Sequence, residues 1–164
     1  QVLDLNLNGE NYIIINNHFK CCGDGTLDIN NSSDEENRRL QAVALLKEYI
    51  DNNLANKKVI VLGDLNDELT DFTSNNVFQE FITDNGNYLF TDIQIAQGNS
   101  ANWSYPTWPS HLDHILITNE LFADFQHPNS EVTVIRIDDY MSSWWNYYQR
   151  KVSDHRPVGI KLNF

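Results

Sequence analysis

Charged and amide side chains stand at the ends of apolar runs in three places of this sequence. Residues 59–62 lead into Gly63-Asp64-Leu65-Asn66, Leu112-Asp113-His114 leads into residues 115–117, and Ser153-Asp154-His155-Arg156-Pro157 leads into residues 158–162. An ionised Asp that leaves water is stable only beside a cation, a histidine or several hydrogen-bond donors. We therefore expect these three segments to meet at one site that takes a hard metal ion and a phosphate.

The order of the expected elements favours a layered α/β or α+β fold. An alternating run at residues 2–7 and an apolar run at residues 12–15 flank Asn8-Gly9, which predicts a hairpin with a tight turn. Ser33 with Glu36 three residues later predicts a capped helix that runs to about Asn53. Further strands are expected at 58–62, 112–118, 131–137 and 156–164, and short helices at 77–82 and 119–125. Residues 88–95 fit a strand or an extended loop, and residues 141–150 carry no clear pattern.

Length and charge narrow the classes of function. The chain of 164 residues suits one domain, and its longest apolar runs have the length of strands rather than of membrane spans. Its net charge of −12 is the wrong sign for a protein that holds nucleic acid mainly by neutralising phosphates. The acidity conflicts less with a metal-dependent hydrolase, because a bound cation then meets the phosphate.

Cys21 and Cys22 are the only cysteines, and they are adjacent. Their spacing fits no zinc pattern, and neighbouring cysteines bridge each other only with strain. Two free thiols are therefore expected, and the compartment is not settled by them.

The first motif supplies oxygen ligands. Asp64 and Asn66 are two residues apart, so in an extended chain both side chains point to the same side. A carboxylate beside a carboxamide suits Mg²⁺ and an attacking water, because the amide orients without adding charge. The competing interpretation is that Gly-Asp-x-Asn forms only a turn.

The other motifs supply histidines with carboxylate neighbours. Asp113 is placed to receive the N–H of a histidine, which would fix its tautomer and support its imidazolium form. Asp154 puts a hard oxygen ligand beside His155, and His18 is a candidate for bonding a phosphate oxygen. By contrast, His111, His114 and His127 are interpreted as structural residues.

Four segments in this order resemble the later motifs of the endonuclease/exonuclease/phosphatase superfamily, in its deoxyribonuclease-like branch. They are Asn17-His18-Phe19-Lys20, Gly63-Asp64-Leu65-Asn66, Leu112-Asp113-His114-Ile115-Leu116 and Ser153-Asp154-His155-Arg156-Pro157-Val158. The resemblance implies a four-layer α/β sandwich and hydrolysis of a phosphoester by in-line attack of water. It also implies dependence on Mg²⁺, with Mn²⁺ or Ca²⁺ as alternative ions.

The resemblance also implies roles for individual residues. His155 resembles the family's histidine at the attacked phosphate, which acts as general base or transition-state donor, and Asp113 resembles its carboxylate partner. Asp64 and Asn66 resemble the pair that positions water, metal or phosphate. Asp154 resembles a carboxylate at or behind the metal, and His18 resembles the additional phosphate-contacting histidine.

The chain departs from the family in its first half. The family's opening strand with an Asn, and the later Glu that is its main metal ligand, have no counterpart in the sequence, and Glu10 is a poor substitute. We therefore expect residues 1–164 to be the C-terminal portion of such a domain, whose N-terminal portion would be a partner. This piece alone is expected to hydrolyse phosphodiesters very poorly, and an apolar sheet face left uncovered favours self-association.

Three functions stay open at this stage. The leading hypothesis is a nuclease-like, metal-dependent phosphodiesterase with water attack assisted by His155 and Asp113. Hydrolysis of lipid or inositol phosphates on the same fold is the second, and a catalytically silent interaction module is the third. The acidic, Asn-rich composition favours an extracellular or periplasmic protein, and a cytoplasmic one is the alternative.

Overall fold

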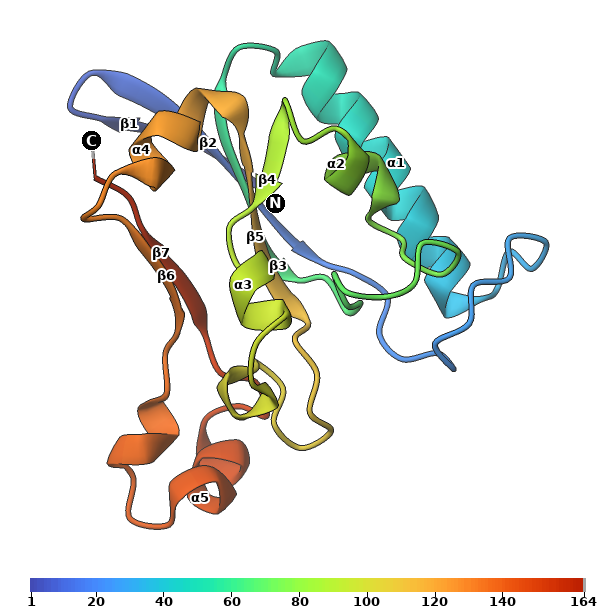
Figure 1. The fold of residues 1–164 in the computed structure, drawn as a ribbon, viewed down its shortest axis with the longest axis vertical. Coiled ribbons are helices and arrows are strands. Elements are labelled where there is room, and N and C mark those ends of the chain that lie inside the picture. Colours follow the sequence, from blue (N-terminus) through green and yellow to red (C-terminus); the bar gives the residue numbers. More distant parts are fainter. Residues whose placement is uncertain (164) are drawn as a thin grey trace.

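The computed structural model describes residues 1–163 and is built around a five-stranded mixed sheet (Figure 1). Its strand order is β1-β2-β3-β5-β4. The strands are β1 (Val2–Leu7), β2 (Glu10–His18), β3 (Lys58–Asp64), β4 (Tyr88–Phe90) and β5 (Asp113–Thr118). Two further strands, β6 (Glu131–Val134) and β7 (Val158–Lys161), form a separate antiparallel ribbon. The expected α/β class is confirmed.

The first hairpin forms as the sequence predicts. Asn8 and Gly9 have φ angles of 54° and 88°, and β1 pairs with β2 from Val2↔Ile15 to Leu7↔Glu10. Two positive φ angles give a turn whose twist matches that of the strands. The long helix α1 (Glu35–Asn53) then carries the chain across the sheet, so that β3 lies parallel to β2.

Helix α1 begins differently from the prediction. Asp34 caps it by accepting a hydrogen bond from the Asn37 N–H, so the cap lies one residue after Ser33. The Glu36 side chain does not complete a capping box; it receives the Gly25 N–H at 2.8 Å and pairs with Arg39 at 3.1 Å. Glu36 and Arg39 are buried, so the first turn of α1 serves a polar network rather than the apolar core.

Two apolar clusters hold the layers together. On one face of the sheet, α1 and α2 (Gln79–Thr83) pack on a core that includes Val43, Val59 and Phe78. On the other face, residues of β7 and α4 (Phe122–Gln126) pack against Ile115 and Ile117 of β5. Figure 1 shows the helices α1 and α2 on one side of the sheet and the β6–β7 ribbon on the opposite side.

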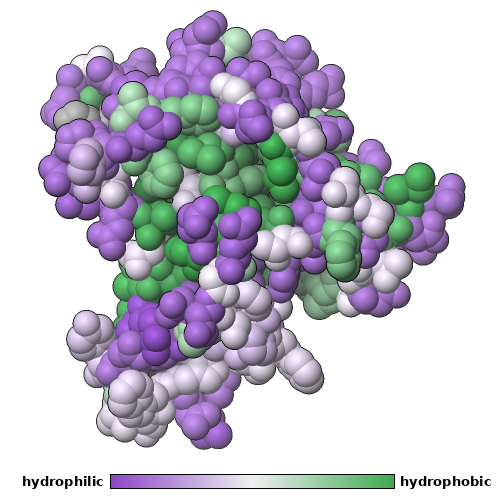
Figure 2. All heavy atoms as spheres, in the orientation of Figure 1, coloured by the Kyte–Doolittle hydropathy of each residue, from purple (hydrophilic) through white to green (hydrophobic). Residues whose placement is uncertain are grey.

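Apolar surface remains visible beside the second cluster. Leu62 and Leu89 of the sheet and Ile160 of β7 are only partly buried there. In the view of Figure 2, apolar atoms reach the surface in the middle of the molecule and are framed by polar side chains. Self-association through such a surface stays a prediction.

The remaining elements refine the sequence-based expectations. Residues 88–95 divide into β4 and the short helix α3 (Ile93–Ala96), and residues 141–150 contain α5 (Trp144–Lys151). Short 3-10 turns occupy Ser100–Asn102, Asn119–Leu121 and Ile137–Tyr140. The strand expected at 131–137 ends at Val134, and the strand expected at 156–164 spans Val158–Lys161, with residue 164 outside the described part. Within residues 1–163, helices with the length and hydropathy of a membrane span are absent.

Candidate active site

Strand register brings three of the predicted residues into one row. His18 at the end of β2 pairs with Asp64 at the end of β3 in the parallel ladder. Asp64 pairs in turn with Asp113, the first residue of β5, in the antiparallel ladder. Neighbouring strands lie about 5 Å apart, so the three side chains stand at one edge of the sheet.

His155 joins this row from the other end of the chain. Its Nδ1 donates to Asp113 Oδ2 at 2.6 Å, and its Nε2 lies 3.8 Å from Asp64 Oδ2. The Tyr105 ring packs on the imidazole at a centroid distance of 4.8 Å, and the Tyr148 hydroxyl donates to the His155 carbonyl at 3.0 Å. The hydrogen bond to Asp113 raises the pKa of His155 against the opposing effect of burial. The histidine is therefore held by a carboxylate on one nitrogen, and its other nitrogen faces the site.

Asp64 lies between the two histidines. Its Oδ2 is 3.5 Å from His18 Nε2 as well as 3.8 Å from His155 Nε2, while its Oδ1 accepts the Asn66 N–H at 3.1 Å. Burial and the nearby Asp113 raise the pKa of Asp64. His18 is far more exposed than the others, with 72% of its side-chain surface accessible.

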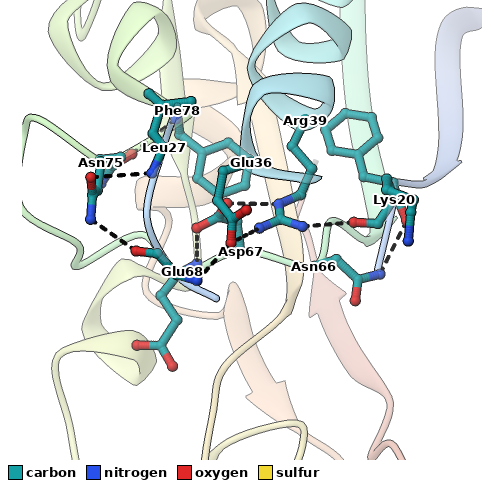
Figure 3. A network of polar contacts seen from close by, with 12 residues as sticks. Lys20, Leu27, Glu36, Arg39, Asn66, Asp67, Glu68, Asn75 and Phe78 are labelled. Carbon is teal, nitrogen blue, oxygen red and sulfur yellow. Dashed lines mark hydrogen bonds and ion pairs between the residues drawn. The ribbon is translucent and has the colours of Figure 1, made fainter. Parts of the chain in front are cut away.

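The turn after β3 depends on two unusual backbone positions. Gly63 has a φ of 135°, and a Cβ there would collide with the Asn17 carbonyl of β2, so only glycine allows the two strand ends to approach. Asn66 has a φ of 56°, a left-handed conformation that Asn tolerates better than most residues. Its side-chain amide donates to the Phe19 carbonyl at 3.2 Å. The Asn66 amide oxygen points away from that contact (Figure 3).

The oxygen ligands suit a magnesium-like ion. Asp64, Asp113 and His155 offer ligand atoms that lie within 4.8 Å of one another. Asp113 Oδ2 is already used by His155, which leaves Asp64 as the carboxylate of this group that could hold an ion. Mg²⁺ uses few protein ligands and keeps several waters, so this small hard-oxygen set fits the ion. Asp154 is exposed and lies outside the group formed by Asp64, Asp113 and His155.

A second group of titratable residues lies behind the site, and it contains an Asp that sequence reasoning missed. Asp92 Oδ2 bonds His114 Nδ1 at 2.6 Å and His111 Nε2 at 3.0 Å, and Asp92 Oδ1 receives the Ile115 N–H. All three side chains of this trio are buried, as the structural interpretation of the two histidines implies. Asp92 follows β4, and no motif surrounds it in the sequence. Its role becomes visible only through its contacts with His111 and His114, which lie just before and within β5.

The trio and Ser104 position the start of β5. The Ser104 hydroxyl accepts the backbone N–H groups of Leu112 and Asp113, each at 3.1 Å. The Ser104 N–H donates to His111 Nδ1 at 3.3 Å, and His111 Nε2 donates to Asp92 Oδ2. The backbone of Asp113 is thus held by Ser104, which in turn bonds His111, and His111 bonds the buried Asp92.

His114 carries a positive charge in this arrangement, which predicts a pH dependence of stability. Its two nitrogens face only acceptors, Asp92 Oδ2 and the Asp67 carbonyl at 2.9 Å. Burial alone lowers the pKa of His114, but the Asp92 carboxylate outweighs it and raises the pKa. The stabilisation of the fold by protonated His114 is therefore complete below the unfolded histidine pKa of about 6.5. It is lost as pH rises through the pKa of His114 in the folded protein. We expect the free energy of unfolding in urea to fall as pH rises through this window.

The measurement is best made in the His155→Ala variant, because the pKa of His155 is also raised and contributes in the same direction. An unfolding free energy that stays constant or increases from about pH 6.5 upward in that variant would contradict a charged His114.

The comparisons with known proteins bear on the family and the fold of the chain. Residues 4–155 match the model of the "Endonuclease/Exonuclease/phosphatase family". A search of curated proteins found no match. Among solved structures, TDP2 from D. rerio complexed with single-strand DNA product is similar, with a TM-score of 0.62, 14% identity and coverage of 99% of this chain and 60% of that one.

Two other solved structures are similar to the chain. The human nocturnin catalytic domain with bound sulfate has a TM-score of 0.56 and 19% identity, with coverage of 99% of this chain and 52% of that one. A mannosyl-6-phosphatase from Bacteroides thetaiotaomicron has a TM-score of 0.52 and 17% identity, with coverage of 96% and 53%. The chain thus spans between 52% and 60% of the length of these three structures, which at such identities support the fold alone. The family match covers nearly the whole sequence, and the chain belongs to the endonuclease/exonuclease/phosphatase family.

Proposed function

We propose that this chain carries the side chains that assist the attack of water on phosphate in a metal-dependent phosphodiesterase. The observation that supports this most directly is the bond between His155 Nδ1 and Asp113 Oδ2, with His155 Nε2 turned toward Asp64. Members of the family are hydrolases that act on phosphoester bonds. A silent interaction module is disfavoured, because carboxylates at strand ends cost stability unless they serve a site.

Four side chains act on the phosphate or the water in the proposed reaction. His155, whose pKa is raised, donates a proton or hydrogen bond to a phosphoryl oxygen at neutral pH, and Asp113 holds its tautomer. Asp64, which lies between His18 and His155, is placed to orient the attacking water. His18 is exposed and contacts another phosphate oxygen from the edge of the site.

Asp64 and Asn66 would hold the ion, and Asp154 would assist from the exposed side. When bound, a divalent ion offsets the negative charge that develops on the phosphoryl group. Mg²⁺ fits the hard oxygen donors best, and Mn²⁺ and Ca²⁺ are the alternatives.

Metal binding has an expected outcome that does not depend on activity. Millimolar Mg²⁺ or Mn²⁺ should raise the thermal unfolding midpoint of the wild-type chain, because a ligand that binds only the folded state stabilises it. Differential scanning fluorimetry with and without EDTA measures this effect. Asn66→Ala should lose most of the shift, while the matched control Asn129→Ala, an exposed asparagine distant in sequence from the motifs, should keep it. Equal shifts in the two variants would place the ion elsewhere.

Four observations bear on the substrate, two on each side. The deoxyribonuclease-like His18 and the TDP2 structure with its DNA product favour a nuclease. The net charge of −12 and the mannosyl-6-phosphatase neighbour favour a smaller phosphoester, among them lipid and inositol phosphates. Assays of the full-length protein on plasmid DNA, RNA, sphingomyelin, inositol phosphates and a hexose phosphate separate these classes. Hydrolysis of none of them with Mg²⁺, Mn²⁺ or Ca²⁺ present would count against the proposal.

We also propose a partner and a compartment for this chain. An N-terminal portion of the same domain as partner is consistent with the 52–60% coverage of the similar structures. An exported protein is proposed from the acidic composition alone.

A further inference from the structure

The two cysteines lie in the loop that leaves the site. Cys21 and Cys22 are exposed, and their sulfurs are 2.8 Å apart, with Cys22 donating to Cys21. They follow His18 by three and four residues, so the loop that carries them starts at the end of β2. Cys22 has a φ of 72° and Gly23 a φ of 112°, a left-handed pair that turns the chain back and keeps both thiols on the outside.

The two thiols are chemically unequal. The hydrogen bond from Cys22, together with the Lys20 ammonium 3.8 Å from its sulfur, lowers the pKa of Cys21. The hydrogen bond to Cys21 correspondingly raises the pKa of Cys22. Since the thiolate is the nucleophile in disulfide exchange, Cys21 is the attacking sulfur and Cys22 is placed to resolve the product.

The backbone around the cysteines is tied to the catalytic turn. The carbonyls of Lys20 and Cys22 both accept from Arg39 Nη1 at 2.8 Å. Arg39 Nε in turn donates to Asp67 Oδ2 at 2.8 Å, as Figure 3 shows. Directly before this stretch, the Asn66 amide donates to the Phe19 carbonyl. A shift of the backbone on either side of the cysteine pair therefore acts on Arg39, which holds Asp67, the residue after Asn66.

We propose that Cys21 and Cys22 form a thiol–disulfide switch that closes a vicinal disulfide on contact with a small disulfide oxidant and thereby displaces the catalytic turn at Asn66. The Cys21 thiolate attacks one sulfur of the small disulfide, which forms a mixed disulfide and releases one thiolate. The Cys22 thiol then loses its proton to solvent, and its sulfur attacks the Cys21 sulfur and releases the second thiolate. The pair is oxidised by two electrons, and the small disulfide is reduced to two thiols.

Reversibility follows from geometry. A ring closed between adjacent residues is strained, and strained, exposed disulfides are the easily reduced ones. Closing the ring draws the two sulfurs from 2.8 Å to a covalent bond, and the backbone that shifts with them includes the carbonyls of Lys20 and Cys22, which Arg39 holds. The disulfide form is thus easily reduced to the two thiols, and its backbone differs near Asn66.

Mass spectrometry of the chain incubated with oxidised glutathione tests the chemistry. The wild type should become two hydrogens lighter, with the bridge located in the peptide that holds both cysteines. Cys22→Ser should instead keep one attached glutathione, and Cys21→Ser should acquire it more slowly. Wild-type protein that retains glutathione on either cysteine, or that links two chains by a disulfide, would overturn the proposal.

NMR of the side-chain amide of Asn66 tests the coupling to the site without using activity. Oxidation should move this resonance in the wild type and leave it in place in the Cys21→Ser, Cys22→Ser double variant, and dithiothreitol should restore it. On a substrate identified for the full-length protein, oxidation should lower the initial rate by about tenfold to a hundredfold, because small displacements of positioning groups have effects of that size. A bridge that forms but leaves the Asn66 resonance unchanged would sink the switch and leave the hydrolase proposal untouched.

Discussion

Replacing His155 with alanine in the full-length protein is expected to lower kcat on its phosphoester substrate by about 10²- to 10⁴-fold, the range for a positioned acid–base group. The variant removes the group whose Nδ1 binds Asp113 and whose Nε2 faces Asp64. The His155 side chain is 22% exposed and bonds Asp113, so its removal should also cost some stability, which has to be measured apart from kcat. Steady-state kinetics together with urea unfolding measure the two effects separately.

His127→Ala is the matched control for this experiment. His127 is exposed, and within residues 1–163 its side chain accepts a hydrogen bond from the Asn129 N–H alone, so its loss should leave kcat unchanged. Asp113→Asn should reproduce much of the defect, because an amide no longer enforces the tautomer of His155. Combining Asp113→Asn with His155→Ala should add little further loss, since residues that act as a unit are not additive. Full activity of His155→Ala would remove it from the reaction.

Replacing Asp92 with alanine is expected to lower the free energy of unfolding by about 3–5 kcal/mol, the usual effect of leaving a buried charge unpaired. Asp92 is fully buried and receives hydrogen bonds from His111, His114 and the Ile115 N–H. Its removal leaves the His114 imidazolium with the Asp67 carbonyl as its only hydrogen-bond partner among the contacts described. Urea unfolding monitored by tryptophan fluorescence gives the change.

Asp139→Ala provides the comparison, because it removes the same side chain and the same charge. Asp139 pairs with Arg136 at 2.9 Å in a partly exposed position. Ion pairs of this kind contribute about 0.2–1 kcal/mol, so the two variants should differ severalfold. If Asp92→Ala proved as stable as Asp139→Ala, the buried trio would not be a structural centre of the fold.

Local sequence patterns predicted the elements where backbone geometry is decided within a few residues. Asn8-Gly9 specifies its hairpin turn, and the alternating residues around it specify the strands, because both signals are local. The predicted cap of α1 was wrong by one residue. Ser33 and Asp34 are both good caps, and only the tertiary packing selects between them. The Glu36 side chain was drawn instead to Arg39 and the Gly25 N–H, which come from the tertiary fold.

The sequence by itself determined the family, because Asp64, Asn66, Asp113 and His155 stand in recognisable order beside apolar runs, and it predicted these residues as the site. Only the tertiary structure decided how they meet. Strand register placed His18, Asp64 and Asp113 in one row, and Asp154 remained outside it. The tertiary structure also revealed Asp92, which is identified only by its hydrogen bonds to His111 and His114, 19 and 22 residues away along the chain. Hydrogen bonds between distant segments depend on strand pairing and packing, and a one-dimensional pattern does not encode their distances.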